Sequence, residues 1–544
     1  MFFCIVKLSF SQSNYHEINS YDLFYSEPFI ELSNIGDPLL LLIPKVKQNI
    51  SISHFSKNIR LIDYFDGLST YATDSIYSAI IYQTNKKNGG TIKSLLSRPL
   101  SNFHDLYFSL TNVSSEGFYQ NQSNKYNNMY LYVNYLDLNN PYSYYLYMLS
   151  NNGIYDQNGG LVNYSNDVTS DLLTTYLENA NTSIKKRFIH YNHRFKFKDN
   201  LAFAHSFKYS LYERFFLDTG SDAYHYDFFI NNSDYYQSFT SLKSYFNDLY
   251  IETDYINLGF SHYLYNTSIL NRNFFSDFIL SAKSIIKLNN LNDFIYKIEY
   301  CPVGYNSHDY NIKLNINNHY GQILNKLELI FSLNKPDLYN NYIDNNIFVP
   351  WSDLFSTQMF HLSLLSNFLK NNFISQIEFK RYNNFLYFDS NLNPTQISNS
   401  INYLNLTFNK LWNFGKIKFK SFFSFQSSNS DIMLFPTLYV YNKFIYTNTL
   451  SDFASVNASI TNRLFTRYNQ PSFSPILDIF YNSTNSSNFL PFLSADIYFS
   501  MDKFSIGLIF DNIHALFLDD NYTINHYYQS EPFIRFSLMW EFNN

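Results

Sequence analysis

Hydrophobic and polar residues alternate along much of the chain, most clearly in its last segment, Phe533–Phe542. In an extended chain, one face of this segment is apolar and ends in aromatic residues: Ile534, Phe536, Leu538, Trp540 and Phe542. The other face is mixed: Arg535, Ser537, Met539 and Glu541. Because a β-strand sends successive side chains to opposite faces, the segment is predicted to be a strand between an apolar and a polar environment.

The same alternation recurs from about residue 75 onward. Clear examples are residues 254–266, 402–409, 493–502 and 415–426, the last with Phe422 out of step. Such stretches are roughly 9–14 residues long, enough for a tilted strand to cross a membrane and longer than ordinary globular strands. We count roughly 18–24 of them, and closure of a single-chain barrel favours an even number.

Clusters of Asn, Asp, Ser and Gly separate these stretches, as expected for turns. A short turn at Asn85–Gly90 contrasts with longer polar connections at 151–181 and 389–399, an asymmetry typical of outer-membrane barrels. Residues 228–230 and 337–351 are compatible with strands or loops. The tyrosine cluster Tyr142–Met148 is compatible with an interfacial girdle or with a tyrosine-rich loop.

Composition narrows the class of protein. Phe, Trp and Tyr make up 20% of the 544 residues and only 15% are charged, although an AT-rich genome would explain part of the aromatic excess. No run of about 18 apolar residues occurs, which excludes a transmembrane helix. The net charge of -6 gives no reason to expect nucleic acid.

Together these patterns predict an all-β fold: a large single-chain antiparallel transmembrane β-barrel of the bacterial outer membrane. A last strand that ends in aromatic residues is typical of such barrels. We therefore expect outer-membrane lipid as a partner, and the barrel-assembly machinery as a second partner that reads Phe533–Phe542. A homo-oligomer is compatible with the sequence.

The N-terminal region departs from the alternation. Residues 1–12 have the features of a residual or short signal peptide, with an ordinary strand as the alternative. Residues 13–70 contain three prolines and are predicted to be an irregular segment that lies on or inside the barrel or leads into it; the barrel itself is assigned to 71–544. The two cysteines, Cys4 and Cys301, cannot make a disulfide framework.

The sequence contains no catalytic or phosphate-binding motif that we recognise. His190 and His193 stand three apart in a predicted strand, so they point to opposite faces and cannot share a metal without a bulge. Asp519 and Asp520 are better explained by a solvated turn than by weak calcium binding. We expect no enzyme activity, no cofactor and no metal.

Three predicted strands carry charged residues on their polar face, and these residues are predicted to face the lumen. They are Arg194, Lys196 and Lys198 on one strand, Glu378 and Lys380 on a second, and Lys416, Lys418 and Lys420 on a third. Lys or Arg facing lipid at the bilayer midplane costs about 2–4 kcal/mol, so these rows imply a wet interior. A soluble sandwich would explain one such strand but leaves the opposite faces of the others without a packing partner.

Several short motifs follow one another in a recognisable order: Leu32–Gly36, Gly117–Gln122, Gln157–Gly160, Pro436–Tyr441, Asp452–Ile460, Thr466–Pro471, Ser474–Phe480, Phe489–Asp496 and Phe533–Phe542. In this order they resemble the "putative porin" family of Bacteroidota outer membranes, over most of the chain. Ser33 stands where the family tends to have glycine, which concerns turn geometry more than fold. The resemblance implies an outer-membrane barrel that forms a pore, and no catalytic residues.

Two functions follow. The first is a porin for passive diffusion of small solutes, with the lumen charges setting selectivity. The alternative is a non-conducting barrel with a structural, adhesive or secretion-accessory role, which occlusion of the lumen by residues 13–70 would favour. A soluble propeller would need repeats of about 40–50 residues, and none is seen. A glycoside-binding enzyme would need paired carboxylates, and none stands out.

Overall fold

A computed structural model gives the fold of the chain. It describes residues 28–44, 50, 59–60, 76–101, 103–137, 139–163, 170–220, 236–267, 274–337, 354–487, 489–518 and 522–543. The predicted signal peptide at 1–12, the segment 228–230, Asp519 and Asp520 lie outside these residues. Within them, no helix is long and apolar enough to cross a membrane.

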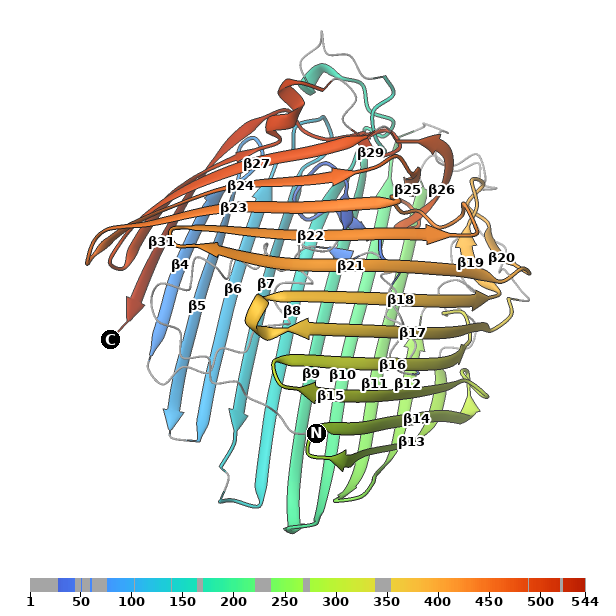
Figure 1. The fold of residues 1–544 in the computed structure, drawn as a ribbon. Helices are drawn as coiled ribbons and strands as arrows, with labels where there is room; N and C mark the ends of the chain where they lie inside the picture. The colour runs from blue at the N-terminus through green and yellow to red at the C-terminus, as the bar shows by residue number, and fades with distance from the viewer. Residues whose placement is uncertain are drawn as a thin grey trace.

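Antiparallel strands close into a single barrel of 22 strands, within the predicted range and even in number (Figure 1). The first half of the barrel comprises β4 (Tyr77–Thr84), β5 (Gly90–Ser101), β6 (His104–Ser115), β7 (Asn124–Tyr135), β8 (Tyr142–Gln157), β9 (Ala180–Lys198), β10 (Leu201–Asp218), β11 (Tyr236–Thr253), β12 (Asn257–Thr267), β13 (Phe274–Asn289) and β14 (Asn292–Gly304). The second half comprises β15 (Tyr310–Tyr320), β16 (Ile323–Asn334), β17 (Thr357–Phe368), β18 (Phe373–Asn383), β21 (Ile401–Phe414), β22 (Ile417–Ser428), β23 (Leu438–Ser451), β24 (Ala454–Phe465), β27 (Leu490–Met501), β28 (Phe504–Asp511) and β31 (Phe533–Asn543).

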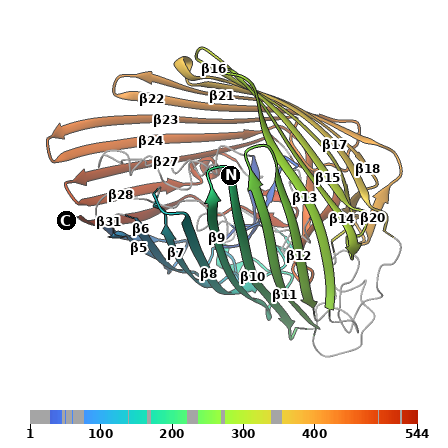
Figure 2. The ribbon, with the colours of Figure 1, turned by 90° about the horizontal axis from the view of Figure 1, so that it is seen from below.

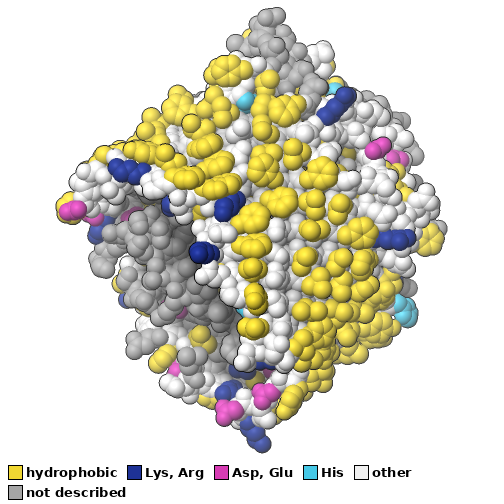
Figure 3. Space-filling view, in the orientation of Figure 1, with side chains coloured by type: hydrophobic (Ala, Val, Ile, Leu, Met, Phe, Trp, Pro, Cys, Tyr) yellow, Lys and Arg dark blue, Asp and Glu magenta, His cyan; other side chains and the backbone are white. Residues whose placement is uncertain are grey.

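The C-terminal strand closes the barrel, as its pattern predicted. β31 pairs with β28 on one side and with β4 on the other, where Asn543 lies opposite Tyr77. Its apolar face points outward, with Ile534 63% and Trp540 52% exposed, whereas Ser537 on the other face is buried. Rows of hydrophobic side chains follow the strands on the outer surface (Figure 3). The alternation therefore separates a lipid face from an inner face.

The two ends of the barrel differ. At the end that holds the C-terminus, the connections are short, such as 199–200, 321–322 and 415–416; we call it the turn end. At the other end, the loop end, they are long, such as 158–179, 384–400 and 466–489. Because β4 starts beside the C-terminus, the short turn Asn85–Gly90 lies at the loop end. The prediction that this short turn lies at the end opposite the long connections was therefore wrong. The other connections named above confirm the predicted asymmetry, with short turns at one end and long loops at the other.

The cluster Tyr142–Met148 lies in β8, so the loop interpretation was wrong. Tyr142 and Tyr144 are on the same face as the exposed Phe195. They form ring contacts with Tyr191 and with His193 of β9, at 6.3 Å between the ring centres of Tyr144 and Tyr191 and 6.0 Å between those of Tyr142 and His193. The tyrosines thus form an aromatic patch near the turn end.

Four small sheets are not part of the barrel wall. Two of them belong to loops at the loop end: β19 (Phe385–Phe388) with β20 (Pro394–Ile397), and β29 (Tyr522–Ile524) with β30 (Tyr527–Tyr528). A third is a hairpin of β25 (Asn469–Ser474) and β26 (Ile479–Ser486). The fourth joins β1 (Phe29–Glu31), β2 (Pro38–Leu41) and β3 (Ile59–Arg60), and its strands lie inside the ring of barrel strands (Figure 2).

Candidate functional site: the loop end of the lumen

Residues 28–44, which we call the inner segment, fold into a tight hairpin. The Asn34 N–H donates to Asp37 Oδ2 at 2.9 Å, and the Leu32 N–H donates to the Pro38 carbonyl at 3.3 Å. Gly36 at the turn has a φ of +83°, and a Cβ there would lie 2.5 Å from Cε1 of Tyr126 on β7. The turn therefore needs glycine both for its backbone conformation and for its close approach to the wall.

Polar side chains of the barrel hold this hairpin in place. Asn124 Nδ2 donates to the Ile35 carbonyl and to Asp37 Oδ1, both at 2.8 Å. Ser115 Oγ donates to Asn34 Oδ1 at 2.7 Å, and Lys86 Nζ donates to the Ser33 carbonyl at 2.5 Å. The inner segment is thus fastened to the ends of β6 and β7 and to the β4–β5 turn, all at the loop end.

On its other side, the inner segment packs against the C-terminal part of the barrel. Its apolar residues Ile30, Leu32 and Leu42 are buried in a cluster with inward-facing residues of β23, β24 and β27: Tyr439, Tyr441, Phe465, Leu490 and Phe492. The guanidinium of Arg463 lies 4.9 Å from the ring centre of Phe29 and 5.0 Å from that of Phe492. This cation–π sandwich joins the segment to β24 and β27.

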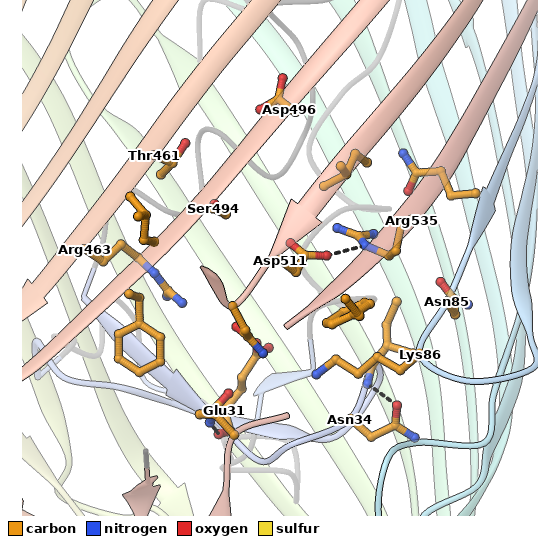
Figure 4. A pocket seen from close by; sticks show the side chains of 18 of the residues that line it. Glu31, Asn34, Asn85, Lys86, Thr461, Arg463, Ser494, Asp496, Asp511 and Arg535 are labelled. Carbon is orange, nitrogen blue, oxygen red and sulfur yellow. Dashed lines mark hydrogen bonds and ion pairs between the residues drawn. The ribbon is translucent and has the colours of Figure 1, made fainter. Parts of the chain in front are cut away.

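A cavity of about 170 Å³ remains between the inner segment and the C-terminal strands (Figure 4). Its charged residues come from distant parts of the chain: Glu31, Lys86, Lys443, Arg463, Asp496, Asp511 and Arg535. Arg535 Nε contacts Asp511 Oδ2 at 2.5 Å. Burial raises the pKa of the Glu31 carboxyl, and the positive charge of Lys86 opposes that rise. Burial lowers the pKa of Lys86, which Glu31 opposes in turn.

The β25–β26 hairpin, which we call the crossing hairpin, spans the loop end. It leaves the barrel between β24 and β27, yet its turn reaches Arg214 on β10. Barrel strands β28 to β9 separate these positions on one side, and β11 to β23 separate them on the other. Arg214 is 2% exposed; its Nη1 donates to the Ile476 carbonyl at 2.9 Å, and its Nη2 donates to the Pro475 carbonyl.

The turn of the crossing hairpin is buried, which is unusual for a loop tip. Ile476 and Leu477 are 0% exposed. They belong to an apolar cluster that also contains inward-facing residues of β6 to β12 and two residues of the connection that carries β19 and β20. The barrel residues are Val113, Tyr126, Tyr155, Ile184, Tyr212, Phe216, Leu242 and Tyr265, and those of the connection are Phe388 and Leu392. The hairpin therefore fills the loop end with an apolar core.

Other loops link the crossing hairpin to the inner segment. The Asn525 N–H donates to the Pro471 carbonyl at 2.9 Å, and Gln529 Nε2 donates to the Glu31 carbonyl at 3.2 Å. Tyr119 Oη donates to the Gln529 carbonyl at 3.0 Å. The Leu161 N–H donates to the His526 carbonyl at 2.8 Å. Among the described residues, the loops and the inner segment form one connected layer across the lumen.

The predicted lumen residues fall into two groups. Arg194, Glu378 and Lys380 lie inside the barrel in polar contacts. Arg194 Nε pairs with Glu252 Oε2 at 2.7 Å, and Lys380 Nζ lies 3.7 Å from Glu378 Oε2. Lys380 Nζ also donates to the Pro44 carbonyl at 2.7 Å, so it holds the end of the inner segment.

The other predicted residues lie at or near the turn end. Lys196 Nζ pairs with Asp199 Oδ1 in the β9–β10 turn at 2.8 Å, and Lys198 is the last residue of β9. Lys416 lies in the β21–β22 turn and donates to Asn448 Oδ1 at 2.6 Å. Lys418 and Lys420 share the face of β22 that carries the buried Ser424 and Gln426, with Lys420 Nζ 5.8 Å from the ring centre of Tyr441. The three rows do not meet in one cationic wall.

Three residues that close the loop end were not singled out from the sequence: Lys86, Arg214 and Arg463. One signal was present. Phe422, out of step in its strand, points inward and packs against the cluster around the inner segment. His190 and His193 do point to opposite faces, His190 bonding to Ser206 and His193 to His205. The described residues hold no group of three or more metal-ligating side chains.

The motifs that carried the family resemblance meet at this site. Leu32–Gly36 docks on Gln122 and Asn124, and the Gln157–Gly160 motif leads into the contact with His526. A family model described as "Putative porin" matches residues 9–544. The chain belongs to this family. No curated protein sequence matches this porin-family chain.

Several solved structures with a similar fold are receptors. The siderophore receptor PirA from Acinetobacter baumannii is 10% identical, with a TM-score of 0.62 over 87% of this chain and 81% of that one. The ferric enterobactin receptor PfeA from Pseudomonas aeruginosa is 9% identical, with a TM-score of 0.61 over 87% and 81%. The ferric-catecholate import receptor Fiu from E. coli is 10% identical, with a TM-score of 0.63 over 95% and 93%. This porin-family barrel is therefore a protein of the bacterial outer membrane.

Proposed function

We propose that this porin-family barrel lets small solutes cross the outer membrane through its lumen, and that the crossing hairpin and inner segment close its loop end at rest. The buried contact between Arg214 and the carbonyls of Pro475 and Ile476 carries the proposal. Passage is passive once the hairpin has moved, so the predicted porin activity is kept and a closed state is added to it.

The energies of the buried contacts support a stable closed state of the loop end rather than an incidental position of the hairpin. A buried guanidinium is costly unless its donors are satisfied, and two of the three Arg214 nitrogens donate to one loop tip, while its Nε has no partner among the described residues. Ile476 and Leu477 beside it are 0% exposed, so about 2–5 kcal/mol would be lost for each if truncated to alanine. Such contacts are strong enough to hold a closed state and few enough to be broken by a solute or partner.

Single-channel recording in planar bilayers tests the proposal. The wild-type protein should open rarely, and Arg214→Ala should open at least ten times more often, because the hairpin loses its anchor on β10. Arg381→Ala is the matched control: its guanidinium bonds to Ser400 and not to the hairpin. Wild-type channels that are always open would contradict the closed state. A barrel that stays silent even when residues 475–478 are replaced by glycines would support the non-conducting alternative.

A receptor-type uptake protein is the second candidate. It is favoured by the likeness to Fiu, which covers 95% of this chain and 93% of that one, and by the placement of the inner segment inside the barrel. In this version a bound ligand opens the loop end. Wild-type channels that stay closed until a ferric catecholate is added would favour it; channels that respond to Arg214→Ala but not to that ligand would favour the solute channel.

A further inference from the structure

Positive charges gather on one side of the outer face of the barrel. In the half of each wall strand nearer the loop end, the described residues include five outward-facing lysines and arginines. One of them, Arg381 on β18, donates to Ser400. The other four lie on β7, β9 and β11: Lys125, Lys185, Arg187 and Lys243. The same halves of β7 to β11 carry two outward acids, Asp156 and Glu213, so positive charge is in excess there.

Arg187 and Lys243 lie where the outer face changes from polar to apolar. The register places Leu211 of β10 opposite Arg187 on one side and opposite Lys243 on the other. The next outward residues toward the loop end are Lys185, Glu213 and Ser241. The next outward residues toward the turn end are Ile189, Tyr209 and Tyr245. Because the change falls at one level on three neighbouring strands, it marks the edge of the apolar band that faces lipid.

These two cations can share one anion. Strands two apart are separated by roughly 10 Å, so each side chain has to span about 5 Å to reach a group over Leu211. Arg187 Nη1 donates to the carbonyls of Asn151 at 3.3 Å and Lys186 at 3.1 Å. Neither Arg187 nor Lys243 forms an ion pair with a residue that the structure describes, whereas Lys185 Nζ already lies 3.2 Å from Glu213 Oε2.

A hollow of about 940 Å³ on the outer surface, which we call the outer hollow, adjoins this pair on the loop-end side. Lys185, the outward neighbour of Arg187 on β9, lines it. Small outward residues leave the space open: Gly90, Ser114 and Ser183. Exposed apolar side chains and amides surround them: Ile92, Ile154, Phe239, Asn112, Asn127 and Asn152. Amides that can bond to hydroxyl groups, beside apolar and ring surfaces, suit a sugar.

We infer that the outer face of β7 to β11 binds a phosphorylated glycolipid of the outer leaflet. Arg187 and Lys243 hold its phosphate over Leu211 through charge-assisted hydrogen bonds. The sugar enters the outer hollow, and the acyl chains follow the strands toward the turn end, past the ring pair of Tyr209 and Tyr245, whose centres are 5.3 Å apart. The long loops of such barrels lie outside the cell, so the loop end meets the outer leaflet.

The binding is independent of solute transport, because every residue of this site faces away from the lumen. Native mass spectrometry of the purified full-length protein in detergent tests the inference. Lipid A, a diglucosamine lipid that carries phosphates, is the probe, and its dephosphorylated form is the comparison. We expect lipid A to bind at least ten times more tightly.

Arg187→Gln with Lys243→Gln should weaken lipid A binding about ten-fold or more, because two charge-assisted bonds are lost. Arg381→Gln with Lys410→Gln is the matched control: it also removes one arginine and one lysine from the outer face, on β18 and β21, and should not weaken binding. Heat-modifiable migration on a gel confirms that each variant is folded. Equal binding of the two lipids, or an equal loss in the two double variants, would overturn the inference.

Two further arms of the experiment test the lipid itself. Phosphatidylglycerol, which has a phosphate but no sugar, should bind several times more weakly than lipid A, because it leaves the outer hollow empty. Equal binding would overturn the assignment to a glycolipid. An excess of inorganic phosphate should not displace lipid A, because the sugar and acyl chains also contact the barrel. Full displacement by phosphate would reduce the site to one for a free anion and overturn the inference.

Discussion

The two halves of the lumen differ, and strand β10 shows how. At the turn end its inward side chains, Ala204, Ser206 and Lys208, line an open cavity of the lumen. At the loop end its inward side chains, Tyr212, Arg214 and Phe216, are buried against the crossing hairpin. One strand with one alternation thus faces open space at one end and a packed core at the other. The inner face of a barrel is therefore not uniform.

The largest effect on channel opening is expected from a variant that removes the packed core at the loop end, so that both ends of the lumen are open. Ile476→Asp with Leu477→Asp puts two carboxylates into the apolar cluster, where burial of an unpaired charge is prohibitive. We expect the hairpin to leave the lumen and the channel to stay open, a change of a hundred-fold or more in open probability in bilayer recordings. Leu172→Asp, in a loop residue that is 68% exposed, is the control. Closed channels in the double variant would show that another element closes the barrel.

The outer face was predictable from the sequence because lipid imposes the same demand on every outward position. In β31 and β12 the alternation alone identified the exposed residues, such as Trp540 and Leu258. The strand number followed only to within a range, because strand ends and loops share Tyr, Asn and Ser. The predicted assembly signal in Phe533–Phe542 and the role of the lumen charges in selectivity stay predictions.

The closed loop end was not predictable, because its contacts join residues far apart in the chain. Arg214 and Ile476 are separated by 262 positions, and Asn34 and Gln122 by 88. No local pattern encodes such pairs. One exception to the local rule was nevertheless visible: Phe422 breaks the alternation of its strand. It packs against the apolar cluster around the inner segment.

Gly36 allows a second test of the loop end, with a smaller effect. Gly36→Ala combines the cost of a positive φ, about 1–2 kcal/mol, with a Cβ 2.5 Å from Tyr126. We expect the inner segment to detach in part, and a protease added to the folded protein to cleave it several times faster. Gly321→Ala, also at positive φ but with nothing within 4 Å, separates the clash from the backbone cost. Equal protection of both variants would mean that the segment does not need the Gly36 contact.

Charge reversal at the turn end should produce a third, smaller change. In the hairpin-open background, Lys208→Glu with Lys283→Glu should move the reversal potential toward that of a cation-selective pore, because both side chains line the open cavity of the lumen at the turn end. Lys416→Glu with Lys418→Glu should move it less, since Lys416 lies in a turn and donates to Asn448. An equal shift of the reversal potential in the two double variants would mean that the lysines of the β22 row influence ion selectivity as much as those of the cavity.

The smallest effects are expected from two neighbours on β9, Arg194 and Lys196, which alternation placed on the same inner face. Arg194→Ala breaks a pair with Glu252 in the cavity wall; Arg194 is 42% exposed in its side chain, so a loss of about 0.2–1 kcal/mol in stability is expected. Lys196→Ala breaks a pair with Asp199, whose side chain is fully exposed, and should leave the midpoint of heat-modifiable migration unchanged.

The bond from Lys196 lowers the pKa of Asp199, so the variant should raise that pKa toward its ordinary value. Any stability from the pair is present above the ordinary pKa of the acid and is lost as the pH falls through the lowered one. A larger loss of stability in Lys196→Ala than in Arg194→Ala would mean that the β9–β10 turn contributes more than the cavity wall to the stability of this end of the barrel.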